Sequence, residues 1–206
     1  NPNASFIAIP TATWEDGSTC EITSVTNRPN NLTQSFYHFI WNNTGQTGEI
    51  NLNAELDVIR GNFTVNSTGS SNLRLIGSGN TLTLGGNLIV ANGAILNLSG
   101  TGSNSIIKLS GNCDIQGTLT ELDASTNSRI EFVGTTPQTW SVTGSITNTV
   151  NFVVDNVQGV LLNTNVVLPS TSTLTLTSGL LTLGNNNLTV SGSISGASSA
   201  RYIVTN

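Results

Sequence analysis

The chain has 206 residues, which is enough for one domain or one extended repeat array. Charged residues make up only 8%, and the net charge of −5 comes without a basic cluster, so the usual signature of a nucleic-acid-binding protein is absent. No stretch of about 18 apolar residues occurs, so the sequence predicts no membrane insertion. Hydrophobic residues still make up 36% and recur at regular spacing, which predicts a packed structure rather than disorder.

Residues 1–53 differ from the rest of the chain because they are rich in aromatic residues and hold the only histidine, His38. Aromatic side chains lie on both faces of a strand predicted at residues 35–41. A repeat array has to cover its first apolar layer, so an atypical terminal unit is expected. We therefore predict an aromatic-rich N-terminal cap at residues 1–53, with residues 54–206 forming the repeats of the same domain.

This N-terminal region carries a resemblance in three segments: WEDGSTCEI at 14–22, NLTQSFY at 31–37 and WNNTGQTG at 41–48. They resemble the start of β-solenoid domains in large secreted surface and adhesin-like proteins of Gram-negative bacteria. The resemblance implies a secreted, cell-surface location, parent proteins with a C-terminal sorting signal, and no catalytic residues. A second cysteine often follows the tryptophan in that family, but Asn42 and Asn43 stand there, so Cys20 lacks a local partner.

From Gly61 to Thr135 the chain contains three consecutive segments of 25 residues, which open at Gly61-Asn62, Gly86-Asn87 and Gly111-Asn112. Each segment holds three short alternating runs, separated by Gly, Ser, Asn and Thr, which tolerate corners. Three strands and three corners describe one coil of a parallel β-helix, with equivalent strands stacked ~4.8 Å apart. We predict an all-β, right-handed parallel β-helix with three short strands per coil. The alternative is an antiparallel sandwich, which has no reason to keep a fixed period.

Within each run, the outer two residues are expected to point inward and the middle residue outward. The middle positions are Thr64, Ile89 and Asp114 in the first run, Arg74, Asn97 and Thr120 in the second, and Thr83, Lys108 and Glu131 in the third. Glu121 interrupts the inward pattern, and we expect Leu122 to take its place through a bulge.

After Thr135 the register loosens into a longer coil with strands predicted at residues 138–142 and 149–154. Later coils resume at about 21–22 residues, and the pattern stops within a predicted strand at Ile203-Val204. An uncovered last coil exposes strand edges and apolar surface. We therefore expect either a continuation of the chain in a longer protein or another subunit that covers this end. The start at Asn1, without Met or an apolar signal region, fits a mature exported product or a trimmed segment equally well.

The outward positions show no catalytic constellation. Glycoside hydrolysis needs two positioned carboxylates, whereas Asp114 stands alone and Lys108 with Glu131 reads as a surface ion pair. We expect His38 to be a packed residue of the aromatic strand. Cys113 falls at the inward position that Phe63 and Leu88 hold in other coils, which predicts a buried thiol. We predict no enzymatic activity, no cofactor and no metal.

The sequence favours an extracellular structural module: a stalk, an adhesin segment or a filament subunit that stacks head-to-tail. Its expected partners are other copies or neighbouring domains, which contact the open C-terminal coil, and glycans. The first alternative is a carbohydrate-binding module that uses the aromatic residues Trp14, Tyr37, Trp41 or Trp140. The second is a polysaccharide-degrading β-helix enzyme.

Overall fold

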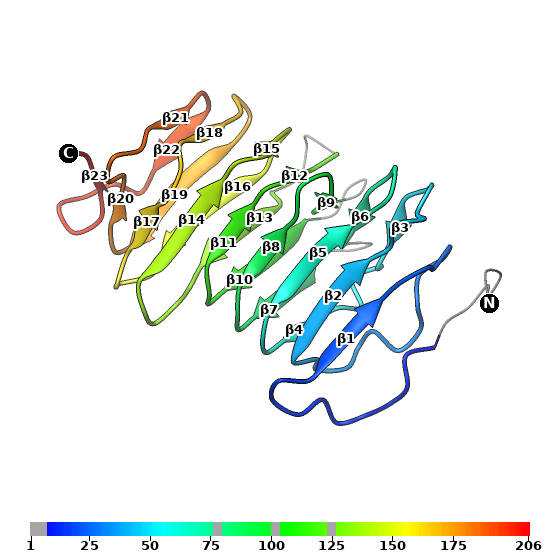
Figure 1. Cartoon of the computed structure of the whole chain (residues 1–206). Coiled ribbons are helices and arrows are strands. Elements are labelled where there is room, and N and C mark those ends of the chain that lie inside the picture. The colour runs from blue at the N-terminus through cyan, green and yellow to red at the C-terminus, as the bar shows by residue number, and fades with distance from the viewer. Residues whose placement is uncertain (1–7, 76–79, 100–103, 123–126) are drawn as a thin grey trace.

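The computed structural model describes residues 8–75, 80–99, 104–122 and 127–206, and in them short β-strands stack into a rod (Figure 1). These residues contain no helix, and hence none that could cross a membrane. The nine-stranded first sheet consists of β1 (Thr19–Ile22), β2 (His38–Asn42), β5 (Phe63–Ser67), β8 (Leu88–Val90), β11 (Cys113–Ile115), β14 (Gln138–Val142), β17 (Val160–Leu162), β20 (Leu181–Thr182) and β23 (Ile203–Val204).

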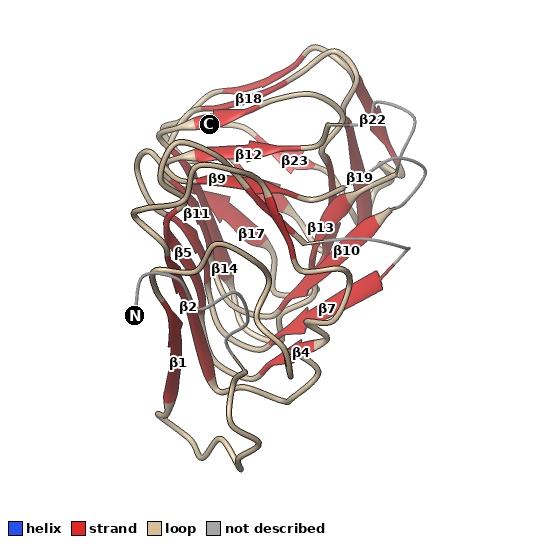
Figure 2. Ribbon diagram, turned by 90° about the vertical axis from the view of Figure 1, so that its right-hand side faces the viewer, coloured by secondary structure: helices blue, strands red, loops and turns tan. Residues whose placement is uncertain are grey.

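Two further sides complete each coil, as Figure 2 shows in the view turned by 90°. The second sheet consists of β4 (Val58–Ile59), β7 (Asn80–Leu84), β10 (Ser105–Leu109), β13 (Arg129–Phe132), β16 (Asn151–Asp155), β19 (Thr173–Ser178) and β22 (Ser193–Ser195). The third side consists of β3 (Ile50–Asn51), β6 (Leu73–Arg74), β9 (Ile95–Asn97), β12 (Thr118–Thr120) and β15 (Ser145–Ile146), and continues with the pair β18 (Val166–Leu168) and β21 (Leu188–Val190).

All pairings between these strands are parallel, which confirms the β-helix and excludes the sandwich. Phe63 pairs with Leu88, and Leu88 with Cys113, at the predicted separation of 25 residues. Trp140 pairs with Leu162 at the shorter separation of 22. Eight turns of chain therefore connect the nine strands of the first sheet.

The Gly-Asn openings have a steric reason. A Cβ atom added at Gly111 would lie 2.4 Å from the carbonyl carbon of Gly86 in the preceding coil, and one at Gly86 would lie 2.5 Å from that of Gly61. Only glycine lets successive coils approach this closely, and the backbone N–H of Gly86 then donates to the carbonyl of Gly61 at 2.8 Å. The repeat therefore marks one corner of each coil.

The core is a single column of inward side chains. Along the first sheet, Phe39, Phe63, Leu88, Cys113 and Trp140 stand in register and are all buried. Burial of each large apolar side chain contributes roughly 1.5–3 kcal/mol before ordering entropy is subtracted. Because each coil adds its own layer, stability accumulates along the rod.

Residues 8–37 cover the N-terminal end of this column. They contribute the buried side chains of Ile9, Val25, Leu32 and Phe36, while β1 is their only strand and extends the first sheet. The Phe36 ring lies 5.0 Å from that of Phe39, so the aromatic residues of this region pack into the core.

The second sequence run departs from the simple alternation. Leu73, Leu96 and Leu119 are inward and in register, as predicted. The prediction that Leu122 takes the inward position in place of Glu121 is wrong, because Glu121 is fully buried and Leu122 is 60% exposed. The Oε1 atom of Glu121 accepts a hydrogen bond from the Ser99 hydroxyl at 2.8 Å, so burial of this carboxylate is compensated by a polar partner.

Candidate functional site

Two of the four aromatic residues expected to bind ligand, Trp41 and Trp140, are fully buried. Trp41 donates its Nε1 hydrogen to Oε1 of Gln46 at 3.0 Å. Trp140 is stacked on Phe152, with ring centroids 4.4 Å apart. Both are inward residues of the first sheet, so neither ring offers a face to a sugar. The expectation of a ligand site at these two residues is therefore wrong for this fold.

The other two, Trp14 and Tyr37, are half-buried, and both contact Arg60. The Arg60 guanidinium stacks over the Tyr37 ring at 5.3 Å from its centroid and donates to the carbonyl oxygen of Trp14 and to Oδ1 of Asp16. The Trp14 ring packs at 5.1 Å from Phe36. Arg60 therefore clamps the N-terminal segment onto the rod, and the sequence alone did not indicate this, because the partners are 44 residues apart.

His38 is a hydrogen-bonded structural residue. Its Nδ1 atom accepts the backbone hydrogen of Asn62 at 2.9 Å, and its ring meets the Tyr37 ring edge-on at 4.6 Å. An acceptor at Nδ1 requires the tautomer with its hydrogen on Nε2. The Nδ1 atom of His38 is therefore already engaged in a hydrogen bond within the protein.

The asparagines of the Gly-Asn openings continue the same line of bonds. Oδ1 of Asn62 accepts from the backbone nitrogen of Asn87 at 2.9 Å, and Oδ1 of Asn87 accepts from that of Asn112 at 2.8 Å. Oδ1 of Asn112 accepts in turn from the backbone nitrogen of Thr139 at 2.8 Å. We call Asn62, Asn87 and Asn112 the asparagine row. In the sequence, the Gly-Asn repeat marks the positions of this row, although the repeat by itself predicts only a corner of each coil.

A polar hollow of about 270 Å³ lies at the C-terminal end of the asparagine row, on the outer face of the first sheet. Its lining residues are Asn87, Ile89, Asn112, Cys113, Asp114, Thr139, Ser141 and Asn163. Nε2 of Gln116 donates to Oδ2 of Asp114 at 2.8 Å and orients this carboxylate. The hollow therefore combines amides, hydroxyls and one acid on a rigid sheet.

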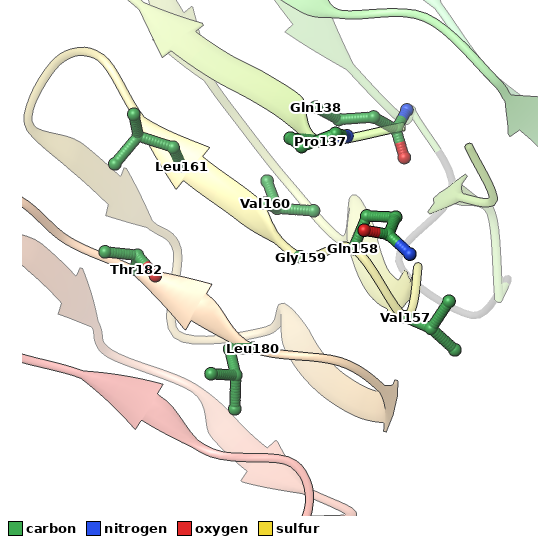
Figure 3. Close-up of a pocket in the computed structure, with 9 residues that line it drawn as sticks. All are labelled: Pro137, Gln138, Val157, Gln158, Gly159, Val160, Leu161, Leu180 and Thr182. Carbon is green, nitrogen blue, oxygen red and sulfur yellow. The ribbon is translucent and has the colours of Figure 1, made fainter. Parts of the chain in front are cut away.

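A second hollow, of about 320 Å³, is apolar and lies where β17 and β20 begin (Figure 3). Val157, 74% exposed, and Leu161, 41% exposed, are among its lining residues. Gln138 at its edge is itself buried, and its Oε1 atom already accepts hydrogen bonds from Gly134 and Asn156. These groups can offer a ligand little beyond apolar contact.

The predicted surface ion pair between Lys108 and Glu131 is wrong. The two residues are in register on β10 and β13, but Glu131 pairs with Arg129 of its own strand at 2.6 Å. The described residues contain no group of three His, Cys, Asp or Glu side chains that could hold a metal.

Both cysteines are free and buried. Burial raises the pKa of the Cys20 thiol to about 11. Burial, together with the nearby Asp114 carboxylate, also raises the pKa of Cys113. Because the thiolate is the reactive form, neither residue is poised as a nucleophile at neutral pH.

The C-terminal end of the core column is open. Leu174 is fully buried, whereas Ile194, its register partner in the last coil, is 47% exposed. Val166 and Leu168 are likewise buried, while their partners Leu188 and Val190 are half-buried. Inward positions of the last coil thus lack the next layer that covers every earlier one.

Comparisons of the chain with models of protein families, with curated proteins and with solved structures find no match.

Proposed function

We propose that this chain is a non-enzymatic structural module of a secreted bacterial surface protein, serving as a stalk, an adhesin segment or a filament subunit. The observation that carries the proposal is the contrast between the buried Leu174 and the exposed Ile194 at equivalent positions of neighbouring coils. An apolar layer that is half open to water, bordered by unpaired strand edges, favours contact with a further coil.

The contact involves the edges of the sheets. β1 and β23 are the two outer strands of the first sheet, so head-to-tail stacking would place β23 of one copy beside β1 of the next. Ile203 of β23 is an inward, half-buried residue of the last coil, so a strand added at this edge would cover it, whereas Cys20 of β1 is already buried within its own copy. A contact of this heterologous type generates open filaments. In a longer protein, a neighbouring domain would use the same edge.

The secreted, cell-surface location forms part of the same proposal. Its support is the resemblance of residues 14–48 to exported surface proteins, together with sparse charge and a surface of Asn, Ser and Thr. The test is protease treatment of intact cells that produce the protein. Degradation without lysis is expected, and full protection would contradict a surface location.

Sedimentation velocity over a wide concentration range tests the association. The wild-type chain is expected to form larger species as concentration rises, and Ile194→Asp is expected to remain monomeric because it puts a charge on the open layer. Val157→Asp is the matched control, since it introduces the same charge at an apolar residue that is 74% exposed elsewhere on the rod. A wild-type chain that stays monomeric throughout, or equal loss of association in both variants, would contradict self-association.

A further inference from the structure

The asparagine row presents one side-chain amide on each of three successive coils. Each Oδ1 atom is fixed by a backbone hydrogen of the next coil, at 2.8–2.9 Å. Since a backbone N–H can only be accepted by the oxygen, these bonds also decide which end of each amide is Nδ2. The rotamers of Asn62, Asn87 and Asn112 are therefore set by the fold.

The Nδ2 groups of this row are available to a ligand. Among the described residues, none of Asn62, Asn87 and Asn112 donates its Nδ2 hydrogens to a protein acceptor, and none of the three Nδ2 atoms is sealed in the core. Neighbouring strands lie ~4.8 Å apart, so the donors recur at about that interval along the rod. A row of donors that is already immobile loses little entropy when it binds.

Acceptors and hydroxyl groups lie beside the row. Asp114 stands two residues after Asn112 on β11, with Oδ2 bonded to Gln116 and Oδ1 open. Ser141 is the register partner of Asp114, and Thr139 follows Asn112 in the row. These side chains line the hollow of about 270 Å³, together with the aliphatic Ile89.

We propose that the asparagine row and this hollow form a binding site for a neutral polysaccharide whose chain runs along the rod axis. Sugar hydroxyls both donate and accept, so they match alternating amide, carboxylate and hydroxyl groups, and Ile89 offers a small apolar contact for ring C–H groups. A polyanion is excluded by the Asp114 carboxylate and by the absence of cationic side chains from the lining. A divalent metal is disfavoured because the hollow supplies a single carboxylate.

The proposal differs from a site built on aromatic residues, and it does not depend on self-association. Trp41 and Trp140 are buried, and the Tyr37 ring face is covered by Arg60. The asparagine row lies on the outer face of the rod, away from the open C-terminal end. Glycan binding and assembly are therefore tested by separate variants.

The test uses the intact chain on an array of neutral oligosaccharides of glucose, galactose, mannose and N-acetylglucosamine, with acidic oligosaccharides for comparison. Titration calorimetry with the best-responding neutral oligosaccharide follows. Asn87→Asp keeps the oxygen that accepts from Asn112 but replaces the outward amide donor. We expect this variant to unfold at the wild-type temperature and to bind the oligosaccharide roughly three- to tenfold more weakly. The same loss of affinity is expected for Asp114→Ala.

Asn151→Asp is the matched control on the second sheet. Oδ1 of Asn151 accepts from the backbone nitrogen of Thr173 at 2.7 Å, so this substitution makes the same chemical change in the same kind of bond on another face. Its affinity should equal that of wild type. The proposal is overturned if no neutral oligosaccharide binds, if Asn151→Asp weakens binding as much as Asn87→Asp, or if Trp14→Ala abolishes binding that Asn87→Asp leaves intact.

Discussion

The Nδ1 atom of His38 lies 2.9 Å from the backbone nitrogen of Asn62 and accepts its hydrogen. Phe39 pairs with Phe63, and Phe63 with Leu88, so the residues directly before them, His38, Asn62 and Asn87, hold equivalent positions in successive coils. An imidazole nitrogen therefore does in the N-terminal coil what an amide oxygen does in the next three. The only histidine of the chain is the first member of a ladder of side-chain acceptors.

His38→Leu should destabilise the protein, because the half-buried N–H of Asn62 loses its acceptor. The expected loss is about 1–3 kcal/mol in the free energy of unfolding, measured with urea. His38→Asn is the control, because it supplies Oδ1 at the same place and also removes the contact with Tyr37. Equal losses in both variants would show that the ring contact, and not the hydrogen bond, stabilises this coil.

Gly111→Ala should be one of the most damaging small substitutions in the rod. The added Cβ would lie 2.4 Å from backbone atoms of Gly86, so two coils have to move apart, at a cost of about 1–3 kcal/mol or more. Gly45→Ala is the control, since nothing lies within 4 Å of the added atom there. Thermal unfolding followed by circular dichroism measures both. A Gly111→Ala protein as stable as Gly45→Ala would contradict the close packing of the corners.

The two buried tryptophans should respond differently to replacement by Phe. Trp41→Phe removes a buried hydrogen bond to Gln46, whereas Nε1 of Trp140 has no partner among the described residues. Both changes reduce core volume by a similar amount. Trp41→Phe should therefore cost about 1 kcal/mol more than Trp140→Phe in urea unfolding. The opposite order would mean that stacking of Trp140 on Phe152 outweighs the hydrogen bond.

The raised pKa values of the thiols predict a loss of stability in alkaline solution. The pKa of Cys20 is raised by burial from 9.0 to about 11, and that of Cys113 is raised as well. Below 9.0 both thiols are neutral in the folded and unfolded chain, and stability is unaffected. Above 9.0 the unfolded chain ionises first, so stability falls, and the contribution of Cys20 ends near pH 11.

This pH dependence is measurable as the urea midpoint between about pH 8 and pH 11. Cys20→Ala should have a lower midpoint at neutral pH because a buried side chain is lost, but a shallower decline above pH 9.0. The slope, and not the absolute midpoint, is the informative quantity. An unchanged slope in Cys20→Ala would show that other groups control alkaline unfolding.

Much of the fold could be predicted because side-chain alternation and a fixed period are local properties of the sequence. The register of Thr64, Ile89 and Asp114 on β5, β8 and β11 follows directly from the 25-residue spacing. The period also places the Gly-Asn corners on top of one another. Any sequence with these spacings in a parallel β-helix has to stack in this way.

The environments of individual side chains could not be predicted in the same way. Glu121 is fully buried and accepts a hydrogen bond from Ser99, and alternation of side chains says nothing about such a contact between segments 22 residues apart. Glu131 pairs with Arg129 and not with Lys108, because the choice between two nearby cations depends on rotamers. The buried indole of Trp41 donates its hydrogen to Gln46, a partner that no pattern identifies.

The direction of the hydrogen bonds also decides how the rod responds to force. The strands lie across the rod, so the bonds between coils point along its axis, from β1 to β23. Tension along the axis pulls these bonds in line, and the contact between β20 and β23 resists it with only two paired residues. Each coil that detaches releases roughly 80 Å of chain. The rod is therefore expected to lengthen in steps of one coil, absorbing work at each step, while the coils behind it stay folded.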